Sequence, residues 1–213
     1  MIQLQNVLPG EIEAESFRII ESEFFDQTGM QISDFTHEEF KILQRVIHAT
    51  GDFTLAEKIV FHNDPVISAI TAIRKGGDII TDVNMVASGI SSTILAKFGG
   101  KICCRIQETA TAVFAKESGT TRSDAAMQRS VSNNVAIVAI GNAPTALLSA
   151  MRLIEQGKMS PGAVVGVPVG FVNAAESKEM LKQTGIPAIT ITGRRGGSPI
   201  AAAIINALLR LAL

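Results

Sequence analysis

Apolar residues repeat with two different periods along the chain. In the first third they recur every three or four positions, which is the spacing of amphipathic helices. Residues 11–24 predict one such helix and Thr36 to His48 a second, which begins with a capping box formed by Thr36 and Glu39. A third is expected from Val66 to Arg74. The first third therefore reads as a helical segment.

From residue 78 onward, short apolar runs alternate with amphipathic stretches. The expected strands cover residues 78–82, 101–106, 134–140, 163–171 and 189–192. We expect helices over residues 90–98, 144–156 and 174–184, and two more that begin near residues 121 and 198. Residues 110–118 are expected to form a helix or a loop. Apolar strands separated by helices are typical of a parallel sheet covered on both faces. We predict a three-layer α/β fold with a mainly parallel sheet, in one domain spanning residues 1–213.

Composition narrows the classes of partner. The 19 basic residues nearly balance the 20 acidic ones, so neither nucleic acid nor a membrane surface is an expected partner. Hydrophobic residues make up 46% of the chain, which favours an oligomeric interface. We expect no signal peptide and no membrane helix, and hence a cytoplasmic protein. The adjacent Cys103 and Cys104 have no metal-ligand spacing and are expected to be buried structural residues, so no metal site is predicted.

The most informative stretch follows the last predicted strand and reads GRRGGSP, residues 193–199. Arg194 and Arg195 supply two fixed positive charges, and the two glycines after them let the backbone approach a bound group. Ser198 is a favoured N-cap and Pro199 a favoured first helical residue. Free N–H groups at a helix start, together with guanidinium groups, attract anions. The alternative is a tight strand–helix turn with two solvated arginines.

Two further strand exits have similar chemistry, Gly141–Thr145 and Gly170–Asn173. Parallel strands would bring all three exits to one edge of the sheet, where ligands of such folds bind. Residues 119–123, which read GTTRS, add a cationic corner rich in hydroxyl groups. This combination suits a ligand with several carboxylates.

Of the three histidines, His48 is the candidate for chemistry. His37 is expected to be exposed in the first turn of its helix, and His62 to lie in a loop. His48 falls in the last turn of its helix, where the helix end stabilises a positive charge, so it is either a proton donor or a capping residue without a catalytic role. The sequence contains no serine-nucleophile, zinc-protease, phosphate-loop or dinucleotide motif.

Six segments together resemble one known family, the precorrin-8X methylmutases, which include the cobalt-precorrin-8 methylmutases. The segments are RVIHATGD (45–52), DIITDVNMVASGI (78–90), GTTRSDAAM (119–127), GNAPTAL (141–147), VGVPVGFVNAAESKEML (165–181) and ITGRRGGSPIAAAIINAL (191–208). The resemblance implies a flavodoxin-like fold and a homodimer with its site near the interface. It also implies an isomerase of cobalamin biosynthesis that moves one methyl group of a tetrapyrrole from ring carbon 11 to ring carbon 12, with no cofactor and no protein-bound metal.

The resemblance also assigns site residues. The catalytic histidine of the family corresponds to His48, which would protonate the macrocycle or stabilise its charge. The polycarboxylate substrate would be bound by Ser16, Thr121, Arg122, Ser123, Asn142, Arg194, Arg195, Gly196, Gly197 and Ser198. Thr121 and Ser123 are equally explained as helix caps. An arginine that the family often has one turn after Ser16 is missing here, and Arg18 is its candidate replacement.

Two rival functions remain open on the sequence. One is a corrinoid-binding or carrier protein without turnover, and the other is a flavodoxin-type phosphate or nucleotide binder, which the glycine loops suggest. Retention of His48 favours the methylmutase over the carrier.

Overall fold

The computed structural model describes residues 7–213, as ten α-helices, six strands and three short 3-10 helices. The α-helices of these residues are α1 (Ile12–Thr28), α2 (His37–Thr50), α3 (Pro65–Arg74), α4 (Asn84–Gly89), α5 (Ser92–Ala96), α6 (Thr109–Glu117), α7 (Arg122–Gln128), α8 (Pro144–Glu155), α9 (Ala174–Lys182) and α10 (Ser198–Ala212). The strands are β1 (Ile59–His62), β2 (Asp78–Thr81), β3 (Ile102–Cys103), β4 (Val135–Ile140), β5 (Ala163–Gly166) and β6 (Ala188–Ile191). The 3-10 helices are Pro9–Glu11, Ile32–Asp34 and Phe53–Leu55.

The six strands form one sheet in the order β1-β6-β5-β4-β2-β3. Strands β2 to β6 are parallel, and β1 pairs with β6 in the antiparallel direction. The five parallel strands, numbered along the chain, have the order 2-1-3-4-5, which is that of flavodoxin-like folds. The predicted fold class is therefore confirmed, with an antiparallel strand added at one edge.

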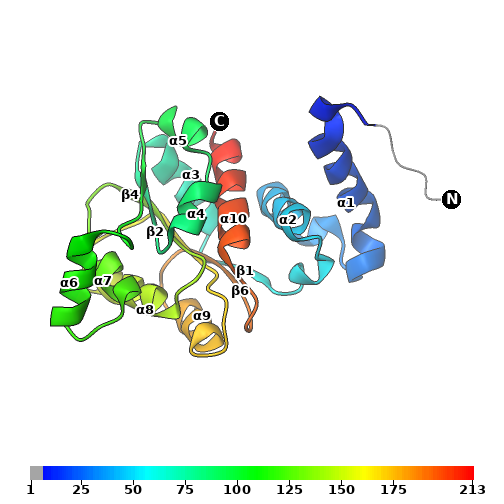
Figure 1. The fold of residues 1–213 in the computed structure, drawn as a ribbon. Helices are drawn as coiled ribbons and strands as arrows, with labels where there is room; N and C mark the ends of the chain where they lie inside the picture. Colours follow the sequence, from blue (N-terminus) through cyan, green and yellow to red (C-terminus); the bar gives the residue numbers. More distant parts are fainter. Residues whose placement is uncertain (1–6) are drawn as a thin grey trace.

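Helices cover both faces of the sheet, and Figure 1 shows α2 beside α10, with α1 on the outer side of α2. The side chains of β4 alternate between the two faces, because successive residues of a strand point to opposite sides. Ile137 and Ala139 pack in the larger core with α2, α3 and α10, whereas Val138 and Ile140 pack in the smaller core with α8. Since all of β4 is buried, it reads as an unbroken apolar run.

Several sequence predictions about individual elements are wrong. The chain around His62 was expected to be a loop, but it forms β1, which the sheet stabilises through pairing with β6. The His62 ring Nε2 also lies 2.7 Å from the carbonyl oxygen of Thr184. The strands expected over 101–106 and 163–171 end after Cys103 and Gly166. The helix expected over 90–98 is shortened to α5, and α4 forms before it, within a stretch for which no helix was expected. Cys103 and Cys104 are free and only partly buried.

The three strand exits meet at one edge, as predicted. Because β4, β5 and β6 are parallel neighbours, their carboxyl ends open on the same side of the sheet. The edge is called the carboxyl edge below. None of the helices described is long and apolar enough to span a bilayer.

Candidate active site at the carboxyl edge

His48 lies in the last turn of α2, where its side chain is exposed, and the capping box of Thr36 and Glu39 begins this helix as predicted. The His48 ring meets the ring of Phe17 edge to face, with 5.3 Å between the ring centroids and an angle of 81° between the planes. Phe17 thereby holds one side of the imidazole. The other edge of the ring remains open to solvent or to a ligand.

Charged groups surround the same phenyl ring. The Arg45 guanidinium lies 5.0 Å from the Phe17 centroid, and its Nη1 is 2.9 Å from the Glu13 carboxylate. The hydrogen bond from Arg45 holds the pKa of Glu13 below its usual range, with smaller contributions from the positive charges of Arg210 and His48. His48 therefore stands in a polar setting built by α1 and α2.

The loop that carries the two arginines, residues 193–197, is fixed by the exit of β5. The N–H of Gly197 donates to the Val167 carbonyl over 2.9 Å, and the N–H of Gly170 donates to the Arg194 carbonyl over 3.3 Å. A Cβ atom at Gly196 would collide with the Val167 carbonyl oxygen. Glycine is thus required here by close contact with the neighbouring loop, whereas the sequence suggested an approach to a ligand.

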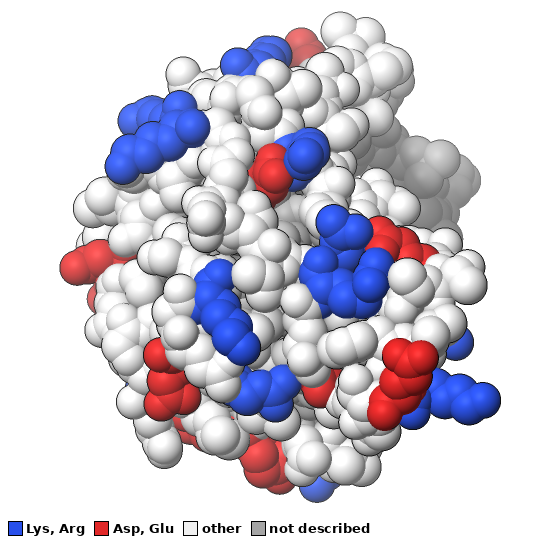
Figure 2. Space-filling view, turned by 90° about the vertical axis from the view of Figure 1, so that its left-hand side faces the viewer, with Lys and Arg blue, Asp and Glu red and all other residues white. Residues whose placement is uncertain are grey.

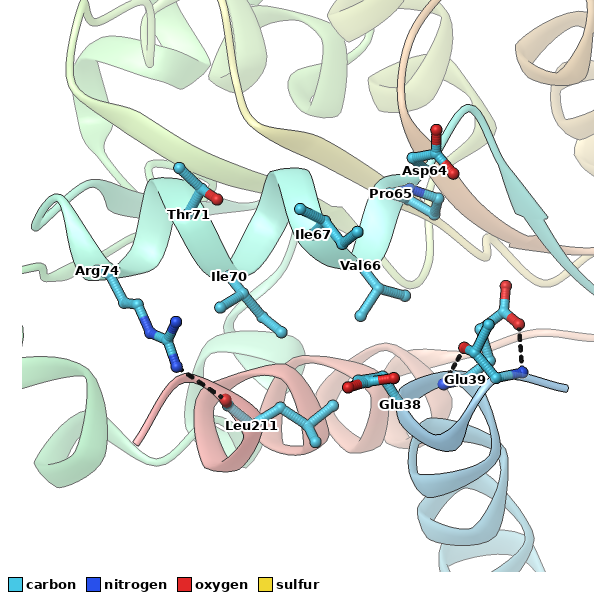
Figure 3. Close-up of a pocket in the computed structure, with 11 residues that line it drawn as sticks. Glu38, Glu39, Asp64, Pro65, Val66, Ile67, Ile70, Thr71, Arg74 and Leu211 are labelled. Carbon is cyan, nitrogen blue, oxygen red and sulfur yellow. Dashed lines mark hydrogen bonds between the residues drawn. The ribbon is translucent and has the colours of Figure 1, made fainter.

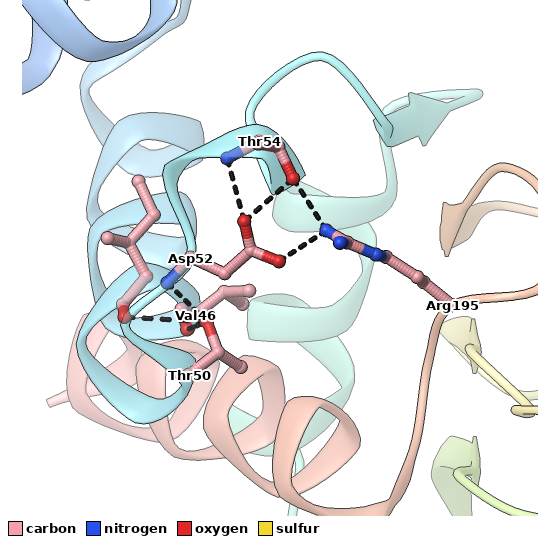
Figure 4. A network of polar contacts seen from close by, with 6 residues as sticks. Val46, Thr50, Asp52, Thr54 and Arg195 are labelled. Atoms are coloured by element: carbon pink, nitrogen blue, oxygen red, sulfur yellow. Dashed lines mark hydrogen bonds and ion pairs between the residues drawn. The ribbon is translucent and has the colours of Figure 1, made fainter.

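Arg195 connects this loop to the segment that follows α2 (Figure 4). Its Nη1 forms an ion pair with the Asp52 carboxylate and donates to the Thr54 hydroxyl over 2.5 Å. Thr54 also donates to Asp52 through its N–H and its hydroxyl, over 3.0 and 2.7 Å. These Thr54 bonds, with the charge of Arg195, hold the pKa of Asp52 below its usual range. Since Asp52 follows His48 by four residues, the arginine loop and the helix end carrying His48 are joined.

The neighbouring arginine has a different environment. The Arg194 guanidinium lies 5.3 Å from the Phe171 ring centroid, and both side chains are exposed. Contact with an aromatic face leaves the N–H groups of a guanidinium available for carboxylates. The expectation that Ser198 caps α10 is wrong, because the N-cap is Gly197, whose φ of 123° suits glycine, and Ser198 is a buried helical residue.

Asp82 occupies the point where the strand order reverses, between β2 and β4. Its carboxylate is buried and accepts hydrogen bonds from the N–H groups of Gly141, Asn142 and Ala143, over 3.1, 2.8 and 2.8 Å. Burial raises the pKa of Asp82, and these N–H donors oppose that rise. A flavodoxin-like fold binds its ligand at this reversal point. Here a carboxylate of the chain fills the N–H cluster, and the Asn142 side chain is exposed beside it.

The hydroxyl-rich corner lies at the exit of β4. Thr121 caps α7 by accepting from the Asp124 N–H over 3.1 Å, and its hydroxyl donates to Thr145 over 3.0 Å. The capping explanation for Thr121 is therefore confirmed. Arg122 is exposed and Ser123 is partly buried. The structure thus brings these residues to the carboxyl edge, on the side away from α2.

Ser16 lies on α1 next to the phenylalanine that contacts His48. Its hydroxyl donates to the Ile12 carbonyl over 2.8 Å, so it currently bonds to its own helix. Arg18 is largely exposed and pairs with Glu15. Ser16 and Arg18 flank Phe17 in the sequence, which places both near the phenyl ring that contacts His48.

A separate groove of about 370 Å³ lies between α3, the start of α2 and the end of α10 (Figure 3). Its carboxylates come from Glu38, Glu39 and Asp64, while its Arg74 donates to the Ala212 carbonyl over 2.9 Å. Acidic walls disfavour a polycarboxylate ligand, and the groove lies at the opposite end of α2 from His48. We therefore place the candidate site at the carboxyl edge.

On the face that Figure 2 shows, the surface charge fits a small ligand better than a nucleic acid. In Figure 2, basic and acidic side chains are scattered over uncharged surface, with no continuous basic field on that face. Among residues 7–213, no group of three or more His, Cys, Asp or Glu side chains is arranged to hold a metal ion.

Sequence reasoning missed several residues that shape this site. Asp52 lies within the segment 45–52, but its partner Arg195 is far away in the chain, so spacing gives no signal for this contact. The sequence leaves Asp82 either as a pocket residue or as the end of a strand, and gives no signal for its three N–H partners. Phe17 looked like an ordinary core residue of its helix. The buried Lys178 sits in an amphipathic stretch where a solvated lysine is the usual expectation.

The chain is a flavodoxin-like α/β protein whose candidate site combines exposed arginines with one histidine. A family profile described as precorrin-8X methylmutase matches residues 11–211. The chain therefore belongs to the precorrin-8X methylmutase family.

Similar proteins support this membership. The chain is 42% identical to a cobalt-precorrin-8 methylmutase of Priestia megaterium, over 97% of this chain and 89% of that protein. It is 39% identical to a precorrin-8X methylmutase of a Sinorhizobium species, over 93% of each chain. The solved structure of precorrin-8x methyl mutase from Thermus thermophilus is similar with a TM-score of 0.83 and 34% identity, covering 95% of this chain and 97% of that one.

Proposed function

We propose that this protein is a methylmutase of cobalamin biosynthesis that moves a methyl group of precorrin-8, or of its cobalt form, from ring carbon 11 to ring carbon 12. The observation that carries the proposal is the family match over residues 11–211, whose segments include both His48 and the arginine loop. The contact between Arg195 and Asp52, which joins those two segments, supports a single site.

The proposed roles follow from the chemistry of an intramolecular shift. Such a reaction requires an oriented substrate and a positioned acid. His48 protonates the macrocycle or stabilises its charge, and a general acid contributes about 10² to 10⁴ in rate. The residues proposed to contact substrate are Ser16, Thr121, Arg122, Ser123, Asn142, Arg194, Arg195, Gly196, Gly197 and Ser198. Arg194 and Arg195 contribute most to the binding of the substrate, because their charges face its acetate and propionate groups.

Incubation of the purified protein with precorrin-8, and separately with its cobalt form, tests this function. We expect the visible spectrum to change as product forms with at least one of them, and the faster reaction identifies the native substrate. Tight binding without a spectral change would instead indicate a carrier. Thermal protection by flavin mononucleotide but not by a corrinoid would indicate a nucleotide binder, against which the filled N–H cluster at Asp82 argues.

Removal of the arginines should separate binding from chemistry. We expect Arg194→Ala to raise KM about tenfold and leave kcat nearly unchanged, because one exposed charged hydrogen bond contributes on the order of 1.4 kcal/mol. Arg195→Ala should raise KM and also lower kcat, because Arg195 holds Asp52 beside the helix end of His48. Steady-state kinetics at low and high salt measure both effects.

The matched control is Lys101→Ala, which removes an exposed charge at the opposite edge of the sheet. The KM difference between Arg194→Ala and the wild type should shrink at high salt, since salt screens exposed charges. Equal KM values for Arg194→Ala and Lys101→Ala would contradict the proposed role of the loop.

We also propose one domain over residues 1–213, assembled as a cytoplasmic homodimer with the site near the interface. Exposed apolar side chains beside the arginine loop support this, since Phe171 and Val172 are 82% and 77% exposed. Contiguous apolar surface is typical of interaction sites. Light scattering during gel filtration should give twice the monomer mass of 22.6 kDa, whereas a monomer would refute the dimer.

A further inference from the structure

A buried lysine lies directly beneath the arginine loop. Lys178 of α9 has no exposed surface, and its Nζ donates to the Arg195 carbonyl oxygen over 2.6 Å. A fully buried lysine is rare unless a carboxylate pairs with it. Among the residues described here, no carboxylate forms an ion pair with Lys178, and the neighbouring Glu179 pairs with Lys182 over 2.6 Å. The ammonium is thus an uncompensated charge beside the loop.

The position of this ammonium relates it to the rest of the site. Its acceptor is the main chain of Arg195, whose side chain reaches Asp52 beyond α2. The same loop receives hydrogen bonds on its other side, from Gly170 to the Arg194 carbonyl. Lys178 therefore holds the carbonyl group of Arg195, within the loop from which both arginine side chains project. It also adds positive potential where a carboxylate would bind.

We propose that Lys178 is a positioning residue for the methylmutase reaction, holding the arginine loop in place and adding, from beneath the loop, a buried positive charge that strengthens the binding of a substrate carboxylate there. The inference rests on the proposed function, because it takes the ligand to be a polycarboxylate. A buried ammonium is costly when it is unpaired, so a role in binding explains why it is there. Lys178 contacts the loop and not the reacting atoms.

The ammonium group of Lys178 should lose its proton within a pH range in which binding can be measured. Burial lowers the pKa of Lys178 to about 8, and the negative charge of Glu179 opposes this shift. Of the elements packed against α9, β6 carries no titratable side chain, and α8 carries Arg152, which pairs with Asp124, and Glu155. From the loop come the charges of Arg194 and Arg195. The ammonium is present below about pH 8 and lost above it, so carboxylate binding should weaken as the pH rises through this value.

Equilibrium binding of the corrinoid product, followed by its visible absorption, tests the proposal without turnover. Lys178→Met keeps the apolar stem, and we expect it to bind about tenfold more weakly at pH 7, with little change up to pH 9. Wild-type protein should weaken over the same range, whereas Lys178→Arg should retain most of the affinity and its binding should stay constant. Lys182→Met, one turn along α9, is the control and should behave like the wild type. A Lys178→Met protein that binds like the wild type at pH 7 overturns the proposal.

A second measurement applies if Lys178→Met does not fold. Glu179→Gln removes a charge that raises the pKa of Lys178, so the loss of affinity should move to lower pH. A flat wild-type profile, or one that Glu179→Gln does not move, overturns the role of Lys178. Failure of the proposed function is a separate result, because it is seen in wild-type protein that binds the corrinoid without converting precorrin-8.

Discussion

His48→Ala is expected to keep the affinity for the tetrapyrrole and to lose most turnover, with kcat falling about 10² to 10⁴-fold. The reason is that binding and catalysis are proposed to depend on different side chains at the carboxyl edge. The carboxylates of the substrate are proposed to meet Arg194 and Arg195, whereas His48 supplies the proton or the charge. Because the imidazole is exposed, its removal leaves no buried cavity and should not affect folding. Single-turnover measurements of the visible spectrum give the rate, and equilibrium titration gives the affinity.

His37→Ala is the matched control for this prediction. His37 is also exposed and begins the same helix, at the end away from the site. Its removal should change neither the rate nor the affinity. If His48→Ala turned over within about threefold of wild type, the imidazole would have no role in the methyl shift.

Asp82→Ala is expected to destabilise the protein strongly, lowering the free energy of unfolding by about 3–5 kcal/mol. The buried carboxylate accepts three backbone N–H groups, and alanine would leave all three without a partner. The exit of β4 should loosen as a result, together with the start of α8. Urea unfolding, analysed as a two-state transition, measures the change.

Asp78→Ala serves as the comparison at the other end of β2. Its carboxylate is partly buried and accepts one backbone N–H, from Lys101 over 3.0 Å. Its removal should therefore cost about 1 kcal/mol. If both variants lost the same free energy of unfolding, the three N–H groups at the reversal point would not need the Asp82 carboxylate as their acceptor.

Most of the fold was predictable because its signals are local. Buried parallel strands give continuous apolar runs, as in 135–140, and the cap at Thr36 is visible within four residues. β1 was not predictable in this way, because the polar residues from His62 onward indicate a loop and its partner β6 lies more than a hundred residues away. Pairing with the sheet outweighs the local preference of this short segment.

The candidate site was predictable in its parts but not in its connections. The segments around His48 and around residues 193–198 are visible in the sequence, and parallel strands explain why the exits of β4, β5 and β6 meet. The contact from Arg195 to Asp52 spans 143 positions, and no pattern of spacing reports it. Lys178 was missed for a related reason, since only packing of α9 against the loop distinguishes it from a surface lysine.

The outer strand β1 has a consequence for the solution behaviour of the protein. In a five-stranded sheet of this order, β6 would lie at the margin with a row of free N–H and C=O groups, which templates aggregation. β1 covers that row along its four residues. At the opposite margin, β3 has two residues. Neither margin of the sheet in residues 7–213 therefore offers a foreign chain more than a short segment on which to grow intermolecular β-structure.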